Sequence, residues 1–188
     1  VVQEMIDGIS LELVEKRLVT DQLVLTVGYD IENLTRPEIR KVYKGPVTTD
    51  RYGRRVPKHA HGTWNLPRAT SSSSELLEAM AALYDKIVNP ALLIRRMSLS
   101  ACHVVNEKMA KEREQKETFE QLDLFTDYAK KEAKEKEEQK KRERERRMQE
   151  ALLTIKKKYG KNAVLRGMNF EDGATAKERN GQIGGHQA

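Results

Sequence analysis

One long stretch of the chain cannot contribute to a hydrophobic core. Residues 129–147 contain no large apolar side chain and consist mainly of lysine, arginine and glutamate. A folded domain must bury apolar surface to offset the entropy lost when its chain is ordered. The core of this 188-residue protein must therefore come from residues 1–110. The sequence predicts one domain of ordinary size followed by a polar extension.

The first 30 residues combine a helical pattern with a strand pattern. Apolar residues recur at spacings of three and four over residues 1–19, which predicts an amphipathic helix. Residues 22–30 alternate instead. Large apolar side chains such as Leu25 point to one face, and small residues such as Thr26 and Gly28 lie on the other.

The rest of the domain continues with loops, strands and one further helix. Residues 31–57 are rich in proline and glycine and are predicted to be a loop with a hairpin near Tyr52–Gly53. Residues 59–67 and 92–105 are predicted strands, and residues 71–88 a helix with an apolar stripe.

This order of elements predicts an α+β fold. A helix–strand–strand–helix–strand chain gives an antiparallel or mixed sheet with two helices on one face and an open second face. We expect the domain to occupy residues 1–108. It is followed by a linker over 109–128, a solvated charged helix over 129–160 and a glycine-rich polar tail over 161–188.

Local signals predict how the helices begin, end and dock. Ser72 with Glu75 predicts a capping box for the helix over 71–88, and Thr175 with Glu178 predicts another in the tail. Gly160 is expected to end the charged helix. The stripe that could dock this helix consists of Met148, Leu152, Ile155 and Tyr159.

The sequence gives little support for catalysis or metal binding. Its histidines are His59, His61, His103 and His186, and their spacing with Cys102 does not match a zinc site. No acidic pair on a buried strand is expected to hold Mg²⁺. The single cysteine suits a reducing cytoplasm, and no apolar run is long enough for a membrane helix.

The predicted open sheet face has the chemistry of a phosphate-binding surface. Small residues let backbone N–H groups approach a ligand, hydroxyl groups donate hydrogen bonds, and arginine neutralises charge. The net charge of +6 agrees with an anionic partner. The alternative, a solvent-exposed sheet with ordinary basic residues, stays open. The face comprises Thr26, Gly28, Thr63, Arg96, Ser98 and Ser100, with Arg51, Arg54, Arg55, Lys58 and Arg68 nearby.

Three segments resemble the C-terminal part of Y-family translesion DNA polymerases, in particular the ImpB/MucB/SamB (UmuC-like) type of Gram-positive bacteria. They are "DRYGRRVPKHAHGTWNLP", "SSSSELLEAMAALYDKIVNPALLIRRMSLSACHVV" and "TIKKKYGKNAVLRGMNFEDGATAKERNGQIGGHQA". The resemblance implies a little-finger domain, in which two helices cover one face of a four-stranded sheet and the other face follows the primer–template duplex. It also implies a role in error-prone DNA repair.

The resemblance further implies that this chain holds DNA without catalysing its synthesis. The polymerase carboxylates and their Mg²⁺ belong to the palm domain, which precedes this region in the family. The family's domain also begins with a strand, whereas this sequence begins within the first helix, so we expect a fragment that lacks one strand.

Individual residues carry the implied DNA contacts. His61, Gly62 and Thr63 match the family's phosphate-contacting strand, with His61 where arginine is common, and Arg95, Arg96 and Ser98 match the last strand. The full set of expected DNA contacts is Arg51, Arg54, Arg55, Lys58, His61, Gly62, Thr63, Arg68, Arg95, Arg96, Ser98 and Ser100.

The pentapeptide Gln121–Phe125, "QLDLF", resembles the motif that binds the bacterial sliding clamp. Leu124 and Phe125 would fill a deep apolar pocket, Leu122 a shallower one, and the Gln121 amide would bond at the rim, while Asp123 faces solvent. An alternative stays open, in which these side chains form one stripe of an amphipathic helix.

A second function from a different class also fits the composition. The long charged helix could belong to a non-enzymatic interaction module such as a coiled-coil adaptor. Residues 129–147 lack the apolar seam that a coiled coil requires, which argues against this alternative.

Overall fold

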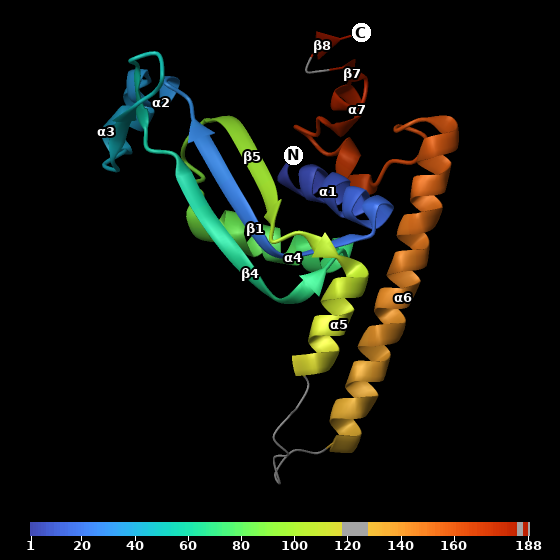
Figure 1. The fold of residues 1–188 in the computed structure, drawn as a ribbon. Helices are drawn as coiled ribbons and strands as arrows, with labels where there is room; N and C mark the ends of the chain where they lie inside the picture. Colours follow the sequence, from blue (N-terminus) through green and yellow to red (C-terminus); the bar gives the residue numbers. More distant parts are fainter. Residues whose placement is uncertain (118–127, 184–185, 188) are drawn as a thin grey trace.

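The computed structural model describes residues 1–117, 128–183 and 186–187, with side chains for 1–114 and 136–182. Its main elements form the predicted α+β domain (Figure 1). In chain order they are α1 (Val2–Lys16), β1 (Leu18–Tyr29), α2 (Glu32–Thr35), α3 (Pro37–Val42), β2 (Val47–Thr49), β3 (Arg55–Pro57), β4 (Ala60–Thr70), α4 (Ser73–Ile87), β5 (Ile94–Cys102) and β6 (Val105–Asn106). The extension contains α5 (Glu107–Glu117), α6 (Tyr128–Tyr159), the 3₁₀ helix η1 (Gly167–Phe170), α7 (Ala176–Arg179), β7 (Gln182–Ile183) and β8 (His186–Gln187).

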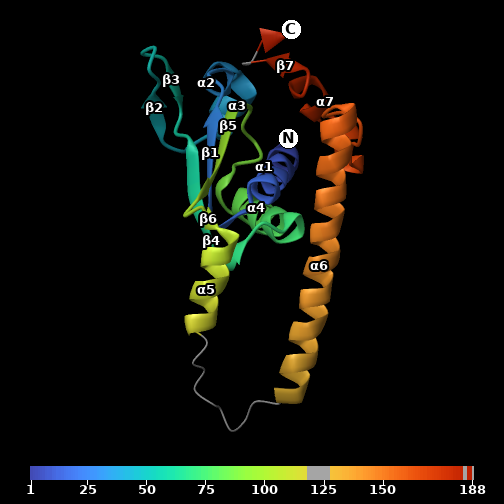
Figure 2. The same cartoon turned by 45° about the vertical axis from the view of Figure 1, so that its right-hand side comes forward.

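The central sheet is antiparallel, with strand order β4-β1-β5, and β6 pairs with the start of β1. Figure 2 shows α1, α4 and α6 together on one side of this sheet. The opposite face of the three long strands is the open face that the sequence predicts.

The core lies between the sheet and the two helices α1 and α4. Leu23, Leu25 and Val27 of β1 are completely buried, as the alternation in residues 22–30 predicts. Leu76 and Met80 of α4 meet them from the helical layer. This apolar layer confirms that residues 1–110 build the core.

The ends of two secondary-structure elements differ from their predicted positions. The first helix ends at Lys16 because Arg17 adopts a left-handed conformation (φ 55°), so β1 begins at Leu18, inside the range predicted as helix. The last strand ends at Cys102 because His103 also has a positive φ (51°). Leu18 and Val19 are apolar residues that fit either a helix or a strand, which explains the first error.

The excursion over residues 31–57 contains more structure than predicted. The hairpin near Tyr52–Gly53 is confirmed as β2 paired with β3, but the short helices α2 and α3 were not predicted. Asn33 anchors the excursion because its buried amide donates to the carbonyl oxygens of Asp30 and Leu93 and accepts from the Leu93 N–H at 2.7 Å.

Only half of the predicted capping box of α4 forms. The Ser72 hydroxyl accepts from the Glu75 N–H at 3.3 Å, as expected. The Glu75 carboxylate does not return to the Ser72 N–H, which donates to Thr70 Oγ1 instead. Glu75 pairs with the guanidinium groups of Arg68 and Arg142, because these cations offer a stronger partner than an amide.

The second half of the charged helix packs on the domain through polar side chains, although most of its residues are exposed. Gln149 is 1% exposed and donates to the Ser71 carbonyl and the Ser73 hydroxyl. The stripe expected to dock this helix instead faces largely outward, because Met148, Ile155 and Tyr159 are exposed. The predicted linker is also helical as far as Glu117, in α5.

The tail packs against α1 through a carboxylate. Gly160 ends α6 with a φ of 97°, as predicted. The Thr175–Glu178 capping box is absent, since the Thr175 hydroxyl has no partner within the described part of the chain. Glu4 of α1 takes its place by accepting from the Thr175 N–H at 3.0 Å and the Ala176 N–H at 3.1 Å.

Candidate nucleic-acid interface

Strand register brings the predicted open-face residues into rows across three strands. Thr26 of β1 lies between His61 of β4 and Ser98 of β5. Val24 lies in the next row, between Thr63 and Ser100. The open face therefore combines residues that are about 35 to 75 positions apart in sequence, because β1 is the central strand.

The open face is polar, shallow and free of negative charge in the described structure. Thr26 Oγ1 lies 2.9 Å from His61 Nδ1, and Gln22 donates to Asn65 at 2.8 Å. Beside these pairs, the face presents exposed hydroxyl groups. Its members in the described strands are Gln22, Val24, Thr26, Gly28, His61, Thr63, Asn65, Arg96, Ser98, Ser100 and Cys102.

Arg96 is the one guanidinium group among these residues. It lies opposite Gly28, whose lack of a side chain leaves the arginine's base uncovered. Within the described residues Arg96 has no carboxylate partner. Arg95 differs, because its Nη1 atom lies 3.5 Å from Asp30 Oδ2, and this carboxylate offsets the positive charge of the arginine. Arg96 is therefore the cation of this face that is most available to an anion.

Two of the predicted contacts lie toward α4 and not on the open face. Gly62 faces α4, and a Cβ atom there would lie 2.9 Å from methyl groups of Leu83 and Ile87. Arg68 pairs with Glu75 at the start of α4. The helix α4 therefore covers the side of β4 that Gly62 faces, and a carboxylate already pairs with Arg68. Contact of these two residues with DNA stays a prediction.

A basic hairpin lies beyond one end of the open face. Figures 1 and 2 place β2–β3 where β1 ends and β4 begins. Arg51, Arg55 and Lys58 are exposed on it or beside it. Arg54 is held by Asp50, with Nη2 to Oδ2 at 2.7 Å, and this contact lowers the pKa of Asp50.

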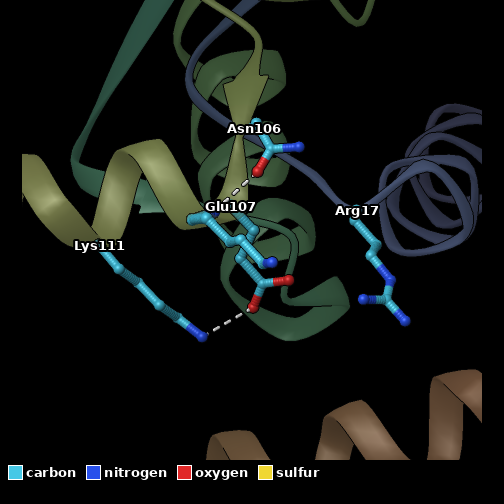
Figure 3. A pocket seen from close by; sticks show the side chains of 5 residues that line it. Arg17, Asn106, Glu107 and Lys111 are labelled. Carbon is cyan, nitrogen blue, oxygen red and sulfur yellow. Dashed lines mark hydrogen bonds and ion pairs between the residues drawn. The ribbon is translucent and has the colours of Figure 1, made fainter.

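A small hollow beside α5 was not predicted from the sequence (Figure 3). It has a volume of about 390 Å³, and Arg17, Asn106, Glu107 and Lys111 line it. Burial acts to raise the pKa of Glu107, but the hydrogen bond from Lys111 and the charges of Arg146 and Arg17 outweigh it and lower the pKa. The Glu107 carboxylate therefore stays ionised and is already paired with cations, so we interpret the hollow as a structural joint and not as a binding site.

The described residues contain neither a candidate metal site nor a candidate membrane-spanning helix. No group of three histidine, cysteine or acidic side chains within them could hold a metal ion. None of the described helices has the length and apolar character needed to cross a bilayer.

The pentapeptide Gln121–Phe125 lies outside the described residues, between α5 and α6. Its predicted role therefore stays a prediction. Comparison of the chain with family models, curated proteins and solved structures finds no match.

Proposed function

We propose that this chain is the DNA-holding and clamp-docking region of a Y-family translesion DNA polymerase. One observation carries the proposal. Three antiparallel strands form an open face of uncharged polar residues and one arginine, and its hydroxyl, amide and guanidinium groups suit a phosphate backbone. The sequence resemblance to the little-finger region of these polymerases gives independent support.

On this proposal the open face follows the primer–template duplex without reading its sequence. Thr26, Ser98 and Ser100 donate to phosphate oxygens, and Arg96 neutralises one phosphate. Synthesis itself, with its carboxylates and Mg²⁺, belongs to a palm domain of the polymerase and not to these residues. This function places the protein in the bacterial cytoplasm, at the nucleoid.

Charge reversal at Arg96 tests the proposal. Arg96→Glu is expected to weaken binding of the 188-residue chain to a primer–template duplex by about tenfold, because it removes one phosphate contact and adds repulsion. Fluorescence anisotropy measures the affinity. The matched control is Arg144→Glu, since Arg144 is an exposed arginine of α6, and Figure 2 shows α6 on the helical side of the sheet. Equal losses in both variants would show that net charge, and not the open face, governs binding.

Clamp docking is the second part of the proposal. A peptide motif of this kind anchors by a few apolar side chains, so Leu124→Ala with Phe125→Ala should abolish binding to the bacterial sliding clamp. Asp123→Ala should leave binding unchanged because Asp123 faces solvent in this interpretation. Clamp affinity that persists in the double variant would exclude the motif as the anchor.

The coiled-coil adaptor is less consistent with the packing of α6. The inward face of α6 already contacts α4 through Arg142, Glu145 and Gln149. A monomer mass that does not change with concentration in sedimentation would argue further against an adaptor.

A further inference from the structure

The hairpin tip carries an exposed aromatic ring in a basic setting. Tyr52 is 64% exposed, although two guanidinium groups lie over its ring. The carbon of the Arg51 guanidinium is 4.7 Å from the ring centroid, and that of Arg54 is 5.0 Å away. A large ring this exposed loses apolar burial, so the packing of the domain does not explain it.

The tip is organised before any ligand arrives. The Asp50 carboxylate accepts from the backbone N–H groups of Tyr52 and Arg54 at 2.9 Å and 3.0 Å. It also fixes the Arg54 side chain through two further contacts. Gly53, with a φ of 76°, closes the turn. Arg51 contacts the Tyr52 hydroxyl and is free of a carboxylate within the described residues, so it can turn off the ring toward an arriving anion and uncover the ring for a base.

The chemistry selects a particular class of ligand. A flat aromatic ring stacks on another flat aromatic group, and neighbouring arginines favour a negative charge beside it. Exposed Arg55 and Lys58 on the same hairpin segment extend the positive charge. A nucleotide offers both properties, since its base is planar and its phosphate is anionic. Its base must be unpaired, because the faces of bases within a duplex are covered by their neighbours.

We propose that Tyr52 is a stacking site for an unpaired base of single-stranded DNA. The proposal rests on the proposed function, since the hairpin lies beyond the end of the open face (Figures 1 and 2). A duplex lying along that face would direct its single-stranded template overhang toward the hairpin. Arg51 and Arg55 contact the overhang phosphates, and Tyr52 receives one base.

Binding to three DNA probes tests the site. The probes share one duplex and carry no overhang, a thymine overhang, or an overhang of the same length with abasic sites. The wild-type chain should bind the thymine overhang about fivefold more tightly than the abasic one, because both supply the same phosphates and only the first supplies bases. Tyr52→Ala should remove this difference and leave binding to the blunt duplex unchanged.

Two further variants keep the test specific. Tyr52→Trp should preserve the preference, since it retains a large aromatic face. Tyr159→Ala should also preserve it, although Tyr159 is equally exposed (66%) and has the Lys158 ammonium 5.1 Å from its ring. Equal affinity of the wild type for thymine and abasic overhangs, or a preference that survives in Tyr52→Ala, would overturn the proposal. Failure to bind any of the probes, the blunt duplex included, would overturn the proposed function as well.

Discussion

The α/β domain and the helical extension are held together by different forces. Within the domain, α1 and α4 meet the sheet through fully buried apolar side chains such as Ile6, Leu25 and Leu83. The described part of the extension attaches through carboxylates, cationic side chains and the amides of Gln149 and Asn169. Burial of apolar surface responds little to pH or to moderate salt, whereas charged contacts respond strongly to both. The two regions should therefore respond differently to the same perturbation.

The contact between α6 and the start of α4 consists of hydrogen bonds and ion pairs between polar side chains. Glu145 accepts from the Ser74 N–H at 2.8 Å and from the Ser72 hydroxyl at 2.7 Å, at the positive end of the α4 dipole. Gln149 adds its two buried hydrogen bonds one turn later. Arg146 completes the network with Ser71 and Glu107. Such a network aligns α6 without a hydrophobic seam.

The acidic face of α1 performs the same role for the tail and the end of α6. Glu4 holds the segment around α7, Asp7 lies 2.9 Å from Arg166, and Glu15 pairs with Lys157 at 2.8 Å. Burial acts to raise the Glu4 pKa, but hydrogen bonds from Thr175, Asn169 and Ala176 outweigh it and lower the pKa. Burial raises the Asp7 pKa, and the charges of Arg166 and Lys156 only partly oppose this.

The largest effect is expected in the domain core. Leu25→Ala removes a completely buried side chain and should lower the free energy of unfolding by about 3 kcal/mol, measured by urea denaturation. Val24→Ala is the control on the neighbouring open-face position and should cost much less. Similar losses in both variants would contradict the assignment of the two faces.

A smaller loss is expected where the sheet meets α4. Gly62→Ala places a methyl group 2.9 Å from Leu83 and Ile87, and should destabilise the domain by about 1–3 kcal/mol. Gly28→Ala is the matched control, because its new Cβ would lie an ordinary 3.8 Å from the Arg96 carbonyl oxygen. If Gly62→Ala is as stable as the wild type but binds DNA less well, Gly62 has the role that the sequence suggested.

Loss of Gln149 should loosen the extension and spare the core. Gln149→Ala leaves the Ser71 carbonyl and the Ser73 hydroxyl without this amide, at a local cost of about 1–2 kcal/mol. Hydrogen exchange should quicken in the second half of α6 while β1 stays protected. Met148→Ala, at the exposed neighbouring residue, should change hydrogen exchange in neither α6 nor β1. Faster exchange in β1 would mean that the two regions unfold as one unit.

The smallest effect should appear in the tail as the pH changes. Because the folded-state pKa of Glu4 lies below its ordinary value of 4.5, its contribution is complete above that pH and is lost as the pH falls through the lowered value. The folded-state pKa of Asp7 is shifted in the opposite direction, upward. Its contribution to stability is therefore present at low pH and is lost as the pH rises through the raised pKa.

Exchange protection factors, which correct for the intrinsic effect of pH, can isolate the Glu4 contribution. Glu4→Gln should lower protection of the Thr175 and Ala176 amides at neutral pH and remove its decrease in acid. Glu12→Gln is the control, since Glu12 pairs with Lys16 on the exposed side of α1. Unchanged protection in Glu4→Gln would show that other contacts hold the tail.

The sequence predicted the domain well because its signals are local. The alternation around Leu25 and the apolar stripe of α4 identify which face each element buries. The polar attachments could not be predicted, because nothing near Glu4 or Gln149 in sequence distinguishes them from solvated residues. The position of Gly62 against α4 could not be predicted for a related reason: only the register with β1 fixes which face a small residue occupies.

The salt dependence of DNA binding tests the central proposal most directly. If the open face neutralises phosphates, the logarithm of the affinity for a primer–template duplex should fall linearly with the logarithm of the salt concentration between about 50 and 200 mM. Arg96→Gln should make this slope shallower by about one, for one lost phosphate contact. An affinity that does not change with salt, or a slope unaffected by Arg96→Gln, would contradict DNA binding by the open face.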